Sequence, residues 1–142
     1  MSCLPRKGTE SIRGLNMSKY FLLIWMLFNH VFDDYTLQGI LSQMKQKSWW
    51  KENAPDKEYE YDYIMALLMH GISWSFMIML PIAVYVGFKV NLAFFLIFLF
   101  NAALHAAIDH LKANEFVINL VADQCLHIVQ ILITFTLAAL PT

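Results

Sequence analysis

The sequence has few charged residues. Asp, Glu, Lys and Arg make up 15% of its 142 positions, whereas soluble domains have about 25%. Hydrophobic residues instead reach 58%, and the mean hydropathy is +0.50. This composition is typical of an integral membrane protein. The net charge of -1 provides no basic surface, so nucleic acid is not an expected partner.

Cysteine is also scarce. Cys3 lies in a polar stretch and Cys125 in an apolar one, so the sequence cannot form a disulfide framework or a zinc ribbon. A serine nucleophile is not expected either. Ser73 and Ser75 lie near His70 but have no carboxylate at a useful spacing.

Long apolar runs alternate with short polar segments along the chain. We expect an all-α fold, an integral membrane four-helix antiparallel bundle, with helices at about 19–44, 63–88, 92–111 and 116–140. Pro81 should bend the second helix. Residues 45–62, with Trp49 and Trp50, should form a wet loop with an aromatic anchor at the membrane interface. Residues 1–16 are expected to be a flexible polar tail preceding the membrane domain at 17–142.

Three pairs of histidine and aspartate interrupt the apolar runs. They are His30 with Asp34, His105 with Asp109, and Asp123 with His127. A spacing of four places both members of a pair on one helical face. Ionisable groups are costly inside a membrane and are usually functional, so these pairs are candidate site residues. Helix rise in an up-down bundle places His30, His70, His105 and His127 about 9 to 16 Å from the same membrane face, which predicts one polar layer.

Metal binding is the chemistry that best suits such a layer. Imidazoles and carboxylates are ligands for zinc, iron and manganese, and helical bundles build sites from them. The candidate ligands are His30, Asp34, His70, His105, Asp109, Asp123 and His127. Seven exceed the three or four that one catalytic zinc needs, so we expect one or two divalent ions, zinc first, with the surplus residues in supporting roles. His110 lies on another face and is a minor candidate.

Three further residues are candidates for acid-base or orienting roles. Asp33 is one residue out of phase with the His30 pair and should point elsewhere, yet it could serve as a general base. Gln38 and Gln124 flank the pairs. We group these three as candidate catalytic residues.

Two other interpretations of the polar residues stay open. Polar side chains in membrane helices can simply hydrogen-bond neighbouring helices. They could also form an ion or proton pathway, which requires polar positions continuing to the opposite face. The sequence has few there, because 22–27, 78–86 and 131–140 are nearly all apolar.

The motifs also resemble those of a known family. The run from His30 to Gln38, HVFDDYTLQ, is similar to the opening motif His-x3-Asp-aromatic-x-Leu-Gln of small bacterial and phage membrane proteins classed as a domain of unknown function. His70, the His105-x3-Asp109-x2-Lys112 element and the Asp123-Gln124-x2-His127 element resemble its later motifs. The resemblance covers about 17–131. It implies a multi-pass protein of the bacterial (host) inner membrane, in a group likened to membrane-bound metal-dependent hydrolases.

Two functions from different classes follow. The first is an integral-membrane metal-dependent hydrolase acting at or near the lipid interface, with a membrane lipid or lipid-linked substrate as its partner. The second is a non-enzymatic phage membrane factor, for superinfection exclusion, lysis or host interaction, in which the polar layer is structural. A cavity connecting the layer to lipid or water would favour the enzyme, since a structural site is closed.

Overall fold

The computed structural model describes residues 18–139, which are all-helical. Six α-helices occur in this part of the chain: α1 (Lys19–Phe32), α2 (Leu41–Met44), α3 (Lys47–Asn53), α4 (Asp62–Tyr85), α5 (Leu92–Ala113) and α6 (Leu120–Ala139). A π-helix, η1 (Asp33–Leu37), follows α1, and a 3₁₀ turn, η2 (Lys57–Tyr59), precedes α4. The all-α prediction is therefore confirmed for these residues. The expected polar tail at 1–16 lies outside them.

Three helices are long and apolar enough to cross a membrane. They are α4 with the turn before it (Lys57–Tyr85), α5 (Leu92–Ala113) and α6, over Leu120–Ala138. Helix α1 has 14 residues, fewer than the 17 to 25 or so that a span needs. The composition of these helices indicates a membrane protein.

The distribution of polar residues agrees with that conclusion. Among the described residues, 13 polar or charged side chains are buried beside 14 hydrophobic ones. Large apolar side chains meanwhile cover the outside of every long helix, including Phe28 on α1, Phe76 on α4 and Phe100 on α5. Soluble proteins rarely expose apolar patches of such extent. Lipid accounts for this surface, because polar groups in a membrane protein gather inside the helix bundle.

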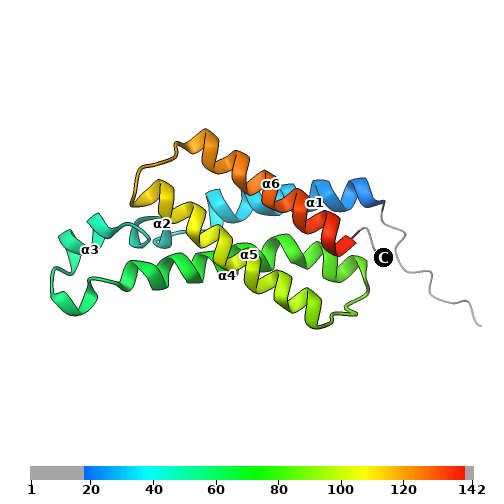
Figure 1. The fold of residues 1–142 in the computed structure, drawn as a ribbon, viewed down its shortest axis with the longest axis horizontal. Coiled ribbons are helices and arrows are strands. Elements are labelled where there is room, and N and C mark those ends of the chain that lie inside the picture. The colour runs from blue at the N-terminus through cyan, green and yellow to red at the C-terminus, as the bar shows by residue number, and fades with distance from the viewer. Residues whose placement is uncertain (1–17, 140–142) are drawn as a thin grey trace, which may run out of the picture.

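The four long helices pack around a shared interior. Helix α4 contacts α1, α5 and α6, and α6 also contacts α1 and α5. Gly71 allows the closest approach, because a Cβ atom there would lie 2.4 Å from the backbone oxygen of Ala102. Figure 1 shows α2, α3 and the loop between α5 and α6 together at one end of the molecule.

The prediction of one continuous helix over 19–44 is wrong. Helix α1 ends at Phe32, the π-helix carries Asp33 and Asp34, and a turn separates it from α2. Gly39 has a φ of 50° in this turn, a left-handed conformation that glycine adopts at little cost. Residue periodicity alone could not reveal the break, because each part of the segment is locally helical.

Pro81 does not end helix α4, which continues to Tyr85. A proline lacks the N–H that would bond the carbonyl four residues earlier, here that of Met77. The side-chain amide of Asn29 donates to that carbonyl oxygen at 2.8 Å. Helix α1 therefore satisfies the group that Pro81 leaves without its usual partner.

The remaining boundaries differ by a few residues. Helix α4 ends at Tyr85 rather than 88, α5 extends to Ala113 rather than 111, and α6 begins at Leu120 rather than 116. The expected loop at 45–62 contains α3 and η2, and its first residue, Lys45, is buried. That segment is therefore only partly a wet loop.

Candidate metal centre

The structure brings the four predicted histidines together. His30, His70, His105 and His127 expose 2%, 1%, 0% and 0% of their surface and come from four different helices. The Nε2 atoms of His70 and His105 are 3.0 Å apart, and the rings of His105 and His127 stack at 4.1 Å. We refer to these histidines with Asp33, Asp34, Asp109 and Asp123 as the polar layer.

Four donor atoms at the centre of this layer converge. They are Asp34 Oδ1, His70 Nε2, His105 Nε2 and Asp109 Oδ2, which we call the four-donor cluster. The oxygens lie 3.4 and 3.6 Å from His70 Nε2, and 3.8 and 3.9 Å from His105 Nε2. In a tetrahedral zinc site with bonds of about 2.0–2.1 Å, ligand atoms are about 3.3–3.4 Å apart. The two histidine nitrogens, 3.0 Å apart, are slightly closer than this spacing, and their distances to the two oxygens are equal to it or longer.

A second group of donors adjoins the first through Asp109. While Oδ2 of Asp109 belongs to the four-donor cluster, its Oδ1 lies 3.4 Å from His127 Nε2. Asp123 Oδ1 is 3.5 Å from the same nitrogen. The sets Asp34, His70, His105 and His105, Asp109, His127 each have ligand atoms close enough to hold an ion. Asp109 could thus bridge two adjacent ions.

Several atoms of the layer have no hydrogen-bond partner within the described residues. These buried atoms are His105 Nδ1, His30 Nε2, both ring nitrogens of His127, Asp33 Oδ2 and Asp123 Oδ1. Buried polar atoms are nearly always satisfied, so a group of orphans needs an explanation. Of these orphan atoms, His127 Nε2 and Asp123 Oδ1 belong to the second group of donors, where an ion would use them, and none belongs to the four-donor cluster. The imidazole and carboxylate donors of both groups are of the kind that bind zinc, iron or manganese.

The charges in the layer also favour a bound cation. Its four aspartates carry four negative charges when ionised, and two ammonium groups contact them. Lys45 Nζ lies 2.5 Å from Asp109 Oδ2, and Lys112 Nζ lies 2.5 Å from Asp123 Oδ2. Asp33 and Asp34 form no ion pair with a lysine among the described residues. A cation in the layer would offset the charge of these carboxylates when they are ionised.

Asp33 does not point away from the layer, contrary to the prediction. It is fully buried, and its Oδ2 lies 3.6 Å from His70 Nδ1, while Ser73 Oγ donates to its Oδ1 at 2.7 Å. The π-helix explains the difference, because its wider turn shifts the phase of the helix and lets the adjacent Asp33 and Asp34 both face inward. The two carboxylates consequently lie on opposite nitrogens of His70.

Gln38 and Gln124 both contact Asp34. The side-chain amide of Gln124 donates to Asp34 Oδ2 at 3.3 Å and to Asp123 Oδ2 at 3.1 Å. The Gln38 amide lies 3.5 Å from Asp34 Oδ1, at the limit of a hydrogen bond. Both glutamines are half-buried. They therefore orient carboxylates and leave the centre of the layer to the histidines.

Neither lysine was among the predicted site residues, because Lys45 begins the predicted loop and Lys112 follows the predicted end of a helix at 111. Lys45 reaches Asp109 from the start of the loop, with only 8% of its side chain exposed. Asn114 holds this part of the loop, since its side chain donates to the Lys45 carbonyl at 2.9 Å and accepts from the Lys47 N–H at 2.7 Å. The His-x3-Asp-x2-Lys spacing was the available signal for Lys112.

Trp74 was missed as well. Its indole N–H donates to His30 Nδ1 at 2.8 Å, and its ring stacks on His105 at 4.3 Å. Trp74 follows His70 by four residues, so both lie on one face of α4. This hydrogen bond holds the His30 ring in place and occupies its Nδ1 atom, so that Nε2 is the other ring nitrogen available for contacts.

His110, the minor candidate, contacts groups outside the layer. Its ring stacks on Tyr63 and its Nε2 lies 3.2 Å from Glu115 Oε1. Glu115 also accepts a hydrogen bond from Lys47 at 3.0 Å, which raises the pKa of Lys47 and lowers the pKa of Glu115. These contacts join α3 to the loop after α5.

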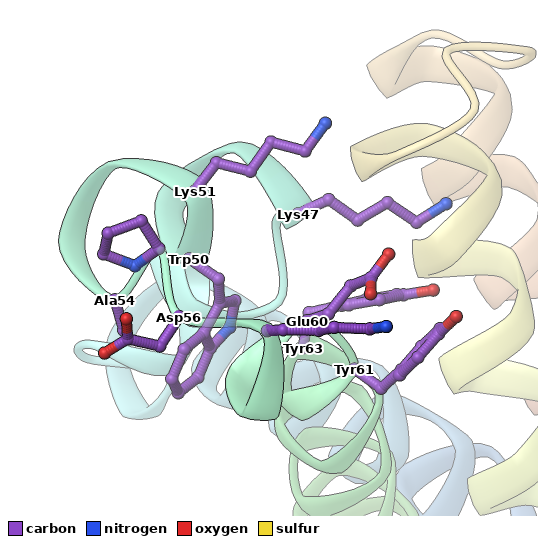
Figure 2. A pocket seen from close by; sticks show the side chains of 10 residues that line it. Lys47, Trp50, Lys51, Ala54, Asp56, Glu60, Tyr61 and Tyr63 are labelled. Atoms are coloured by element: carbon purple, nitrogen blue, oxygen red, sulfur yellow. The ribbon is translucent and has the colours of Figure 1, made fainter.

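Two cavities lie at the end of the molecule that holds α2 and α3. One, of about 340 Å³, borders the polar layer and is lined by Asp34, Gln38, Lys45, Lys112 and Gln124 among others. The other, of about 460 Å³, lies at α3 and the turn before α4. Figure 2 shows Lys47 and Lys51 extending from α3 in this second cavity, with Trp50 and Tyr61 on its other side. None of the second cavity's lining residues belongs to the polar layer.

Comparison with known proteins adds no relative. No family model, no curated protein and no solved structure matches this chain.

Proposed function

We propose that the protein is a four-helix antiparallel membrane bundle in which α1 and η1 together form the fourth span. Lys19–Phe32 and Asp33–Leu37 give 19 consecutive helical residues, a length that can cross a bilayer. The exposed apolar side chains of α1, such as Phe21, Ile24 and Phe28, support lipid contact on its outer face. The motif resemblance supports the bacterial inner membrane as its location.

We further propose that this protein is a metal-dependent hydrolase acting at the lipid interface. The observation that carries the proposal is the 340 Å³ cavity that reaches Asp34, since Asp34 Oδ1 also belongs to the four-donor cluster. A structural metal site is closed, whereas a catalytic site needs access for substrate and water. Here one member of the donor set, Asp34, lies at the wall of an open cavity.

The chain's own residues divide into three roles under this proposal. Asp34, His70, His105 and Asp109 would hold the ion, which supplies a Lewis acid for hydrolysis. Asp33 would accept the Nδ1 proton of His70 and keep Nε2 directed at the cluster, the usual task of a carboxylate behind a metal-binding histidine. His127 and Asp123 would either hold a second ion or, beside a single ion, move protons.

A non-enzymatic role is the second candidate. The Lys45–Asp109 and Lys112–Asp123 ion pairs already neutralise two carboxylates and join the loops to α5 and α6. Such pairs would stabilise a purely structural layer in a membrane factor. The open cavity beside Asp34 favours the enzyme instead.

The test is metal-dependent turnover in a lipid environment. Purified protein reconstituted in phosphatidylethanolamine and phosphatidylglycerol vesicles would be loaded with zinc, manganese or iron, and the lipids followed by mass spectrometry. Release of headgroups or acyl chains by loaded protein, lost on chelation and in Asp109→Asn, is the expected result. Unchanged lipids with protein that retains its metal would favour the membrane-factor candidate.

A further inference from the structure

We infer that the 340 Å³ cavity beside the polar layer is a binding site for the phosphate group of a phosphate-ester substrate, with Lys45 and Lys112 as its cationic residues. This inference rests on the proposed function and adds the class of substrate. The cavity is lined by both lysines, by Gln38 and Gln124, and by Asp34. It therefore combines cationic donors with direct contact to the four-donor cluster.

The two ammonium groups have donors to spare. An ammonium group has three N–H bonds, and each lysine gives one of them to an aspartate, Lys45 to Asp109 and Lys112 to Asp123. Each ion pair also fixes the position of its ammonium group at the cavity wall. Lys45 is almost wholly buried, so its placement there is not that of a solvated surface lysine.

A phosphate group suits the donors of this cavity. A phosphate monoester carries about -1.5 to -2 charges at pH 7 and offers three acceptor oxygens. The two lysines and the two glutamines supply N–H donors around the same space. A phosphate bound there would accept hydrogen bonds from them and lie beside Asp34, a member of the four-donor cluster.

Three exposed apolar side chains also line the cavity, those of Tyr35, Phe116 and Leu120. Tyr35 lies on the π-helix, Phe116 just before α6 and Leu120 at its start. Lysines together with exposed aromatic and aliphatic side chains fit an amphiphile that has a phosphate headgroup and acyl chains.

The experiment measures binding and metal content together. Detergent-purified, zinc-loaded protein would be titrated with dioctanoyl phosphatidic acid, inorganic phosphate and dioctanoylglycerol, and binding followed by native mass spectrometry. Wild type would be compared with Lys112→Gln, Lys45→Gln and the control Lys89→Gln. Lys89 lines a cavity whose other lining residues belong to the Val86–Phe94 region and to α5 and α6, none of them in the polar layer.

We expect phosphatidic acid to bind and dioctanoylglycerol not to bind. Loss of one charge-assisted hydrogen bond should weaken phosphatidic acid binding about tenfold or more in Lys112→Gln. Its zinc content should stay at the wild-type level, because Lys112 is not a ligand, and Lys89→Gln should match wild type. Phosphate binding as tight as phosphatidic acid would support the phosphate site and identify a soluble ester as the substrate.

Two results would overturn the inference. Equal binding of dioctanoylglycerol and phosphatidic acid would show that the cavity does not recognise the phosphate group. Wild-type affinity in both Lys112→Gln and Lys45→Gln, with zinc still bound, would remove the role of the lysines. If instead the proposed metal-dependent function is wrong, the wild-type protein will take up no zinc. That result differs from both of the results above.

Discussion

At the scale of single residues, His105 occupies the centre of the polar layer. Its Nε2 faces His70, Asp34 and Asp109, and its ring stacks on those of Trp74 and His127. It belongs to both candidate ligand sets. Unlike Asp109, which also joins the two groups of donors, His105 has no ion pair with a lysine among the described residues, so its substitution is the sharpest test at this scale.

His105→Ala should remove most of the bound metal, because it removes a ligand common to both sets. Metal per mole of folded, monodisperse protein would be measured by inductively coupled plasma mass spectrometry. His110→Ala is the matched control, since His110 lies one helix turn further along α5 and contacts Glu115. Full metal content in His105→Ala would exclude this histidine as a ligand.

Substitution of Asp33 tests whether the contact that the π-helix gives it with His70 matters for metal binding. Because it contacts His70 Nδ1 and no atom of the four-donor cluster, Asp33→Asn should retain a metal site but weaken its affinity about 10- to 100-fold. Competition with a zinc chelator of known affinity measures this change. An affinity equal to that of wild type would show that Asp33 does not orient His70.

At the scale of elements, the contact between α4 and α5 sets the distance between His70 and His105. Gly71→Ala would place a Cβ 2.4 Å from the backbone oxygen of Ala102, so the helices must separate. Overpacking of this kind costs about 1 to 3 kcal/mol. Both the unfolding temperature in detergent and the metal affinity should fall. Ala103→Leu, on the exposed face of α5, should change neither.

The bond from Asn29 to Met77 gives a second prediction about elements. Asn29→Leu would leave the Met77 carbonyl, freed by Pro81, without its partner in an apolar interior. An unsatisfied buried group costs about 1 to 3 kcal/mol. Thermal unfolding in detergent should show this loss, with Asn53→Leu in the exposed part of α3 as the control. Equal stability of the two variants would contradict this account of how α4 tolerates Pro81.

The same elements show what the sequence could and could not predict. Four-residue spacing in apolar sequence identified the His30, His105 and His127 pairs, because helical geometry is local. The π-helix could not be anticipated. Its wider turn moves Asp33 to the inner face of the helix, and the residue composition of the segment gives no sign of this change. The lysines were missed for another reason: a loop residue such as Lys45 reaches Asp109, 64 positions away, only through tertiary packing.

At the scale of the whole molecule, the protein is polar inside and apolar outside over its long helices. This arrangement requires lipid around α4, α5 and α6, the three helices that could span a membrane. The interior then encloses more carboxylates than its lysines neutralise. A cation held by the converging donors would offset part of this excess charge.

The central claim is that this layer binds a divalent metal ion. The most direct measurement is the metal content of detergent-purified wild-type protein, before and after chelation and after titration with zinc, manganese or iron. The account predicts about one or two equivalents per chain and a lower unfolding temperature after chelation, restored by the metal. Protein that binds no metal under titration, and whose unfolding temperature is unaffected by chelator, would contradict it.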